Sequence, residues 1–220
     1  MIQIQTTTLD FLNLLMRNNN KEWFDKHRTD YLAAKANFES FVQALLNEIT
    51  GFDPIMKGLE AKSCIFRINR DIRFSHDKSP YKTNMGAFMV KGGKKNGDKF
   101  AGYYFHIEPG KSMLAGGAYL PPAQWLTAIR EKIDDEPATL LKAINTPEFK
   151  KYFGQLEGEK LKKAPKGFDP GHKYIELLKF KSFLAIHNPL DKQILGSDYL
   201  KYSAEVFRAM KPLNDFLNEY

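Results

Sequence analysis

Three apolar segments between residues 85 and 121 constrain the fold of this chain most strongly, because very short connections join them. The segments are MGAFMVK, FAGYYFHIEP and SMLAGGAYLP, separated by the turn-rich GGKKNGD and by the pair Pro109–Gly110. A parallel strand pair needs a crossover of a dozen or more residues, so connections this short indicate antiparallel neighbours. The sequence therefore predicts a β-meander in the middle of the chain.

The segments on both sides of this meander have a helical period. From Phe24 to Ile49 apolar side chains recur three and four residues apart, which predicts one long amphipathic helix. Prolines and a threonine after residue 120 mark further helix starts, and KSFLAIH predicts a fourth strand. A last helix from about Asp198 should break near Lys211–Pro212, because proline lacks the N–H that a helix interior uses.

No internal repeat and no long linker divides the chain. We therefore expect one α+β domain over residues 1–220, in which N-terminal and C-terminal helices cover a mainly antiparallel β-meander. FLNLLM after Asp10 has no basic segment before it, which indicates a helix rather than a signal peptide. No apolar run reaches membrane-spanning length, and the single cysteine, Cys64, excludes an internal disulfide framework. These features predict a cytoplasmic protein without a membrane partner.

Positive charge is concentrated within CIFRINRDIRFSHDKSPYKTN. Residues 62–84 carry six basic and two acidic side chains, in a chain with a net charge of +7. Residues 65–74 alternate between polar and apolar side chains, which predicts a strand with one polar face. The alternating polar positions are Arg67, Asn69, Asp71 and Arg73. Guanidinium forks suit phosphate or carboxylate, but the same charges could form a structural network in which Asp71 holds the arginines.

Arg70 falls on the apolar face of this predicted strand, where an unpaired charge is untenable. Either a bulge turns it to the polar side, or it pairs with an acid such as Glu22, Glu108 or Asp134. The turn-forming SHDKSPYKTN that follows adds Lys78, Tyr81 and Lys82 around Pro80. These three side chains could grip a phosphate together with the arginines, or they could belong to a solvated loop.

His106 is the best candidate for acid/base chemistry, because imidazole can take and give a proton near neutral pH. In the predicted strand FAGYYFHIEP it shares a face with Tyr104 and Glu108. The other histidines show no metal-ligand spacing, and the nucleotide-loop, nucleophile-elbow and zinc-helix motifs are absent. We therefore expect neither a metal site nor a cofactor.

Several strings together resemble one bacterial family, domain of unknown function 2461. They are NNNKEWFDKHRTDY, FRINRDIRFSHDKSPYKTN, AGYYFHIEPG, APKGFDPGH and KPLNDFLN, which span nearly the whole chain in order. The resemblance implies a stand-alone, single-domain bacterial cytoplasmic protein. It implies no catalytic residues, because the family has no assigned activity.

Two functional hypotheses of different classes follow. In the first, a pocket binds a phosphate-bearing ligand through Arg67, Asn69, Asp71, Arg73, Lys78, Tyr81 and Lys82, and His106 with Glu108 could add acid/base chemistry. In the second, a non-enzymatic module binds nucleic acid or an acidic protein through its basic face. A third, structural interpretation assigns the charges to stability alone. The sequence does not indicate which oligomeric state the protein has.

Overall fold

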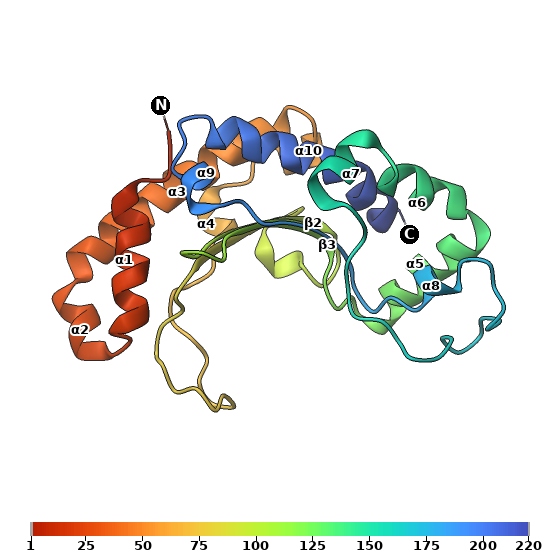
Figure 1. Ribbon diagram of the computed structural model, residues 1–220, viewed down its shortest axis with the longest axis horizontal. Coiled ribbons are helices and arrows are strands. Elements are labelled where there is room, and N and C mark those ends of the chain that lie inside the picture. Colours follow the sequence, from red (N-terminus) through yellow and green to blue (C-terminus); the bar gives the residue numbers. More distant parts are fainter. Residues whose placement is uncertain (1, 220) are drawn as a thin grey trace.

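The fold is built around a four-stranded antiparallel sheet, seen in a computed structural model that describes residues 2–219 (Figure 1). Its strands are β1 (Met85–Met89), β2 (Gly102–Ile107), β3 (Met113–Ala118) and β4 (Phe183–His187). They lie in the order β1-β2-β3-β4, and every neighbouring pair is antiparallel. The predicted meander, the fourth strand and the α+β class are therefore confirmed.

Helices precede and follow the meander. Before it come α1 (Thr6–Arg17), α2 (Lys21–Lys26), α3 (Arg28–Thr50), η1 (Pro54–Met56) and α4 (Ala61–Cys64), and η2 (Lys94–Asn96) lies between β1 and β2. After it come α5 (Ala123–Asp135), α6 (Pro137–Ile144), α7 (Pro147–Phe153), α8 (Ile175–Leu178), α9 (Asp191–Ile194) and α10 (Tyr199–Asn218). Among the described residues, no helix has the length and apolarity needed to cross a membrane.

Two details of the predicted helices are wrong. The single helix predicted over residues 24–49 is divided at His27, whose ring stacks on Trp23 with centroids 4.0 Å apart. The final helix does not break at Pro212, which lies inside α10. Buried residues on both sides of the proline, among them Met210 and Leu213, hold the helix on the sheet. This packing outweighs the loss of one backbone hydrogen bond.

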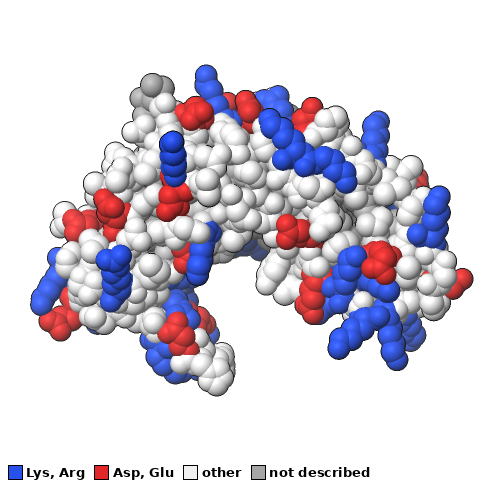
Figure 2. Space-filling model, in the orientation of Figure 1, with Lys and Arg blue, Asp and Glu red and all other residues white. Residues whose placement is uncertain are grey.

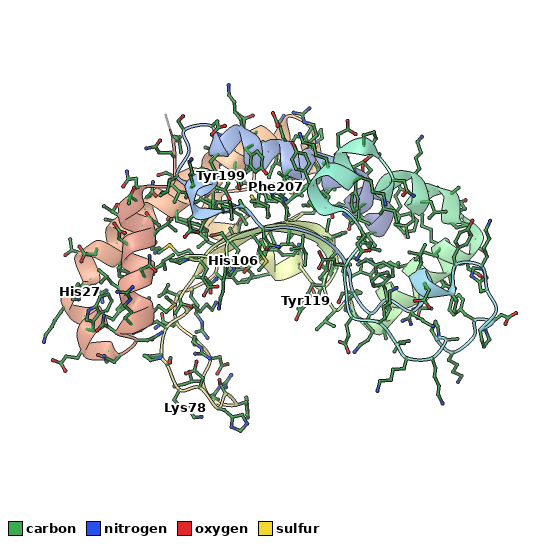
Figure 3. All side chains as sticks on the ribbon, viewed as in Figure 1. His27, Lys78, His106, Tyr119, Tyr199 and Phe207 are labelled. Atoms are coloured by element: carbon green, nitrogen blue, oxygen red, sulfur yellow. The ribbon has the colours of Figure 1, made fainter. Side chains whose placement is uncertain are left out.

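One face of the sheet is buried under helices and the other is open. Phe105 of β2 stacks between Phe38 and Phe41 of α3, with centroid distances of 5.5 and 5.1 Å. Figure 3 places Tyr199 and Phe207 on this helix-covered side, whereas His106 and Tyr119 lie on the opposite side. Because side chains alternate along a strand, Tyr104 and His106 of β2, and Glu108 directly after it, point to the side opposite Phe105.

Residues 65–84, which we call the arm, form a projection that hangs below the sheet edge (Figure 1). The predicted 65–74 strand is wrong as a regular element, because only Ile65 and Asn69 form bridges, with Ala87 and Tyr81. Backbone bonds from Lys82 to Ile68 (2.8 Å) and from Arg70 to Pro80 (2.9 Å) tie the two sides together.

Arg70 does not meet any of the acids suggested by the sequence. Its guanidinium forms an ion pair with Asp77, and a second nitrogen donates to Ser75 Oγ at 3.3 Å. Asp77 also accepts hydrogen bonds from the backbone and hydroxyl of Ser79, and these bonds, with Arg70, lower the pKa of its carboxyl. Arg70 therefore has a structural role, because its contacts hold the two sides of the arm together near its end.

Candidate functional site

A bulge at the base of the arm creates the polar centre of the candidate site. Ile65 and Asn69 are four positions apart in the chain. Their bridge partners, Ala87 and Tyr81, are six positions apart, so the second side of the arm contains two extra residues. Consecutive side chains in a regular strand would point to opposite faces. Here Thr83 and Asn84 both contact the open face of β2, Thr83 through Glu108 and Asn84 through His106.

His106 lies at the centre of this network, with only 8% of its surface exposed. Its Nε2 is 3.2 Å from Glu108 Oε2, and its Nδ1 is 3.0 Å from the Tyr104 hydroxyl and 3.2 Å from Asn84 Nδ2. Thr83 Oγ1 donates to the second Glu108 oxygen at 2.7 Å. A carboxylate only accepts, so the His106 Nε2–H donates to Glu108, and Nδ1 is left to accept from Tyr104 and Asn84.

Gly86 makes room for this arrangement. It pairs with His106 across β1 and β2, and a Cβ atom there would lie 2.8 Å from the Tyr104 hydroxyl oxygen. Without a side chain at position 86, the Tyr104 ring can lie over β1 and reach His106. Burial raises the pKa of Tyr104, and the Glu108 charge raises it further, so the phenol stays neutral and can donate.

Burial lowers the pKa of His106 below its ordinary value of 6.5, although Glu108 acts in the opposite direction. The unfolded chain therefore binds a proton at this position more readily than the folded protein does. This contribution to stability is complete above pH 6.5 and declines as the pH falls below that value.

We expect acidification from pH 7.5 to pH 5 to lower the melting temperature of the wild type more than that of His106→Gln. The extra slope cannot exceed about 1.4 kcal/mol per pH unit, because a single proton is involved. Thermal unfolding over this pH range measures the difference, and the four remaining histidines are common to both proteins. Parallel pH profiles would contradict the assignment of a buried neutral imidazole.

Arg67 and Lys82 form a pair of adjacent cations beside this network. Burial lowers the pKa of Lys82, and the positive charge of Arg67 lowers it further. Within residues 2–219, neither side chain takes part in an ion pair or a side-chain hydrogen bond. The Lys82 ammonium lies over the Phe66 ring, 5.5 Å from its centroid. Asp71 attracts Arg67 only at longer range, and no ion pair compensates Lys82, so the two cations can accept an anionic ligand.

An apolar cavity of ≈ 670 Å³ adjoins this pair on the open face of the sheet. Its wall includes four aromatic residues, Phe66, Phe88, Tyr104 and Tyr119. Lys94 and Lys95 of η2 border it on the side away from the sheet. Phe66 also lines a second cavity of ≈ 550 Å³ together with Arg67, Asn69 and Asn84. Phe66 is thus a shared wall between the cationic and the apolar parts of the site.

The structure separates the predicted ligand residues into two groups. Arg67, Asn69 and Lys82 lie at the base of the arm and line its cavities. Asp71, Arg73 and Lys78 lie toward its exposed end, where Figure 3 labels Lys78. There the Arg73 guanidinium donates two hydrogen bonds to Asp71, at 2.9 and 2.7 Å, and Lys78 donates to the Ile72 carbonyl at 3.0 Å.

Tyr81 has a structural role that its sequence context did not reveal. Its ring stacks on Phe24 at 3.9 Å between centroids, and only 7% of its surface is exposed. Its backbone N–H donates to the Asn19 side chain at 3.1 Å, and its carbonyl accepts from the same side chain at 2.9 Å. Tyr81 therefore anchors the arm to the turn between α1 and α2.

Sequence reasoning did not assign Phe66, Thr83, Asn84 or Tyr104 to the site. Tyr104 carried a signal, since it shares a strand face with His106. Thr83 and Asn84 carried none, because the bulge that directs both to β2 has no signature in the local sequence. Among residues 2–219, no group of three or more histidine, cysteine, aspartate or glutamate side chains is placed to hold a metal ion.

The chain belongs to the family described as "Conserved hypothetical protein (DUF2461)", whose model matches residues 7–216. The resemblance inferred from the sequence is thereby confirmed. No curated protein and no solved structure matches the chain.

Proposed function

We propose that the protein binds a phosphate-bearing small molecule at the base of the arm. Arg67 and Lys82 hold the phosphate, and the Tyr104–His106–Glu108 network contacts the rest of the ligand. The observation that carries the proposal is the adjacent pair of cations, Arg67 and Lys82, neither of which forms an ion pair, beside a buried histidine network. A phosphate between the two cations would supply a close anionic partner, since the Asp71 carboxylate is hydrogen-bonded to Arg73 and reaches Arg67 only at longer range.

The same network supports acid/base chemistry on the bound ligand. Tyr104 is the network member that lines the apolar cavity, and its hydroxyl donates to His106 Nδ1. A ligand hydroxyl beside Tyr104 could pass its proton to the Tyr104 oxygen as the phenolic proton moves to His106. The Glu108 carboxylate would then stabilise the imidazolium. The reverse sequence would return the proton to a leaving oxygen.

The distribution of charge favours a second candidate function, non-enzymatic binding of nucleic acid. Figure 2 shows Lys and Arg side chains gathered at the end of the arm and at the lower right of the molecule, with a hollow between the two groups. Such a surface with about four phosphate contacts would lose roughly 10²-fold in affinity between 50 and 200 mM salt. A single bound phosphate would lose far less.

A thermal-shift panel tests the proposal. It contains sulfate, inorganic phosphate, sugar phosphates, mono- and dinucleotides, and short single- and double-stranded oligonucleotides. A ligand at 100 times its Kd stabilises the folded state by about 2.7 kcal/mol, which raises the melting temperature by roughly 5–10 °C at this size. We expect a phosphate-bearing small molecule to give this shift.

Two single variants locate the effect. Lys82→Ala should abolish the shift, and Lys78→Ala, which removes the same charge near the end of the arm, should retain it. A shift that depends on Lys78 and not on Lys82 would contradict the proposed location. A shift confined to oligonucleotides, with the steep salt dependence above, would favour the second candidate.

A further inference from the structure

The apolar cavity beside the cationic pair would not be filled by a phosphate bound at Arg67 and Lys82. Its floor is formed by side chains from the open face of the sheet, including Met113, Ala115, Leu184 and Ile186. Register places Ala115 between Tyr104 of β2 and Ile186 of β4. At ≈ 670 Å³ the cavity is within the ordinary size range of small-molecule sites.

Most hydrogen-bonding groups of the wall belong to exposed side chains that water can reach, namely Lys95, Asp98 and Tyr119. Lys94 already donates to the Lys62 and Ser63 carbonyls, at 3.4 and 3.3 Å, and the Tyr104 hydroxyl contacts His106. A nucleobase carries several donors and acceptors, and each one buried without a partner weakens binding. A hydrocarbon group has no such requirement. The cavity therefore fits an apolar occupant better than a base.

Positive charge lies at two borders of this cavity. Lys95 is exposed beside it on η2, and Lys82 lies over Phe66, which forms part of the cavity wall. A molecule with an anionic head at Arg67 and Lys82 would pass over Phe66 and place its other end among the apolar side chains. Lys95 shares its border with the acidic Asp98, whereas no ion pair compensates Lys82, so the anionic head is placed at Arg67 and Lys82.

We infer that the ligand is a phosphate monoester of a hydrocarbon group, with the phosphate at Arg67 and Lys82 and the hydrocarbon in the cavity lined by Phe66, Tyr104 and Ala115. This inference rests on the proposed phosphate site and adds the chemical class of the ligand. One cavity accommodates one chain, so the ligand is taken up as a soluble ester rather than as a head group in a bilayer.

Titration with a series of alkyl phosphates tests the inference. The probes are inorganic phosphate and the ethyl, butyl, hexyl and octyl monoesters, with adenosine monophosphate for comparison. Burying one methylene contributes about 0.8 kcal/mol, so affinity should increase by up to about fourfold per CH₂ until the cavity is full. Hexyl phosphate should therefore bind far more tightly than both ethyl phosphate and the nucleotide.

Filling the cavity should remove this dependence on chain length. Ala115→Leu occupies the space with a side chain of the protein, so the increase in affinity should stop at shorter esters while inorganic phosphate binds as before. Ala36→Leu on the exposed surface of α3 is the matched control and should keep the wild-type series. Ile186→Phe provides a second filling variant should Ala115→Leu fail to fold.

The outcomes separate this inference from the proposal on which it rests. Binding of phosphate with equal affinity for all esters, or tighter binding of the nucleotide, would overturn the hydrocarbon inference and leave the phosphate site in place. No binding of any probe would overturn both. Flotation with vesicles that contain phosphatidic acid should show no binding; binding to vesicles but not to soluble esters would also overturn the inference.

Discussion

Gly117→Ala is expected to destabilise the protein by at least about 3 kcal/mol, lowering the melting temperature by 6 °C or more or preventing soluble expression. Gly117 has φ +112°, a conformation that side chains rarely adopt. A Cβ atom there would also lie 2.0 Å from the Phe183 carbonyl oxygen of β4. Since that atom belongs to a paired backbone, β3 and β4 would have to separate.

Gly110→Ala is the matched control for this prediction. Gly110 has φ +71°, but no atom lies within 4 Å of the position of an added Cβ. In this variant only backbone strain lowers the free energy of unfolding, by about 1–2 kcal/mol. Urea and thermal unfolding of both variants measure the difference. Equal destabilisation would mean that close approach of the strands is not what requires Gly117.

The sheet could be predicted from the sequence because its connections are short and local. The connection between β2 and β3, residues 108–112, is too short for a crossover, so antiparallel pairing followed directly; the connection between β1 and β2, residues 90–101, is longer, and its glycines and polar residues indicated turns. The glycine at position 117 allows a close approach of β3 to the backbone of β4. Continuity of α10 through Pro212 could not be predicted in this way, because packing against β3 decides it.

The arm shows the limit of hydrophobic periodicity. Alternation over 65–74 predicted a strand, yet it could not show that the second half projects beyond the sheet. Phe74, placed on the apolar face by its parity, is 94% exposed. Asp77 lies only seven residues from Arg70 and is its partner, because the chain turns back between them. Local turn geometry, rather than parity, governs this segment.

The candidate site could be predicted only in part. Strand parity correctly grouped Tyr104, His106 and Glu108, because the first two lie in β2 and Glu108 directly follows its last residue. Arg67 and Lys82 are close because two segments of the arm pair around a bulge. The spacing of the two residues along the chain does not reveal this pairing. Nothing in the sequence separated the charged end of the arm from its base, although Arg70 and Arg73 form ion pairs there and Lys78 donates to a backbone carbonyl.

The largest expected effect on binding comes from Arg67→Gln combined with Lys82→Gln. A hydrogen bond to a charged group contributes about 1.5–3 kcal/mol, so loss of two should weaken phosphate binding by at least about 100-fold. The free protein should keep its melting temperature, because neither residue loses an ion pair and one repulsion disappears. A purely structural role would predict the opposite, namely lower stability and no change in binding.

Calorimetric titration of inorganic phosphate, at constant ionic strength, tests the central claim most directly. The proteins are the wild type, the Arg67→Gln/Lys82→Gln double variant and an Arg73→Gln/Lys78→Gln double variant. The last pair removes the same charge near the exposed end of the arm, where both groups already have partners. We predict that binding disappears only in the Arg67/Lys82 variant. Equal affinity in all three proteins, or a loss confined to the Arg73/Lys78 variant, would contradict an anion site at the base of the arm.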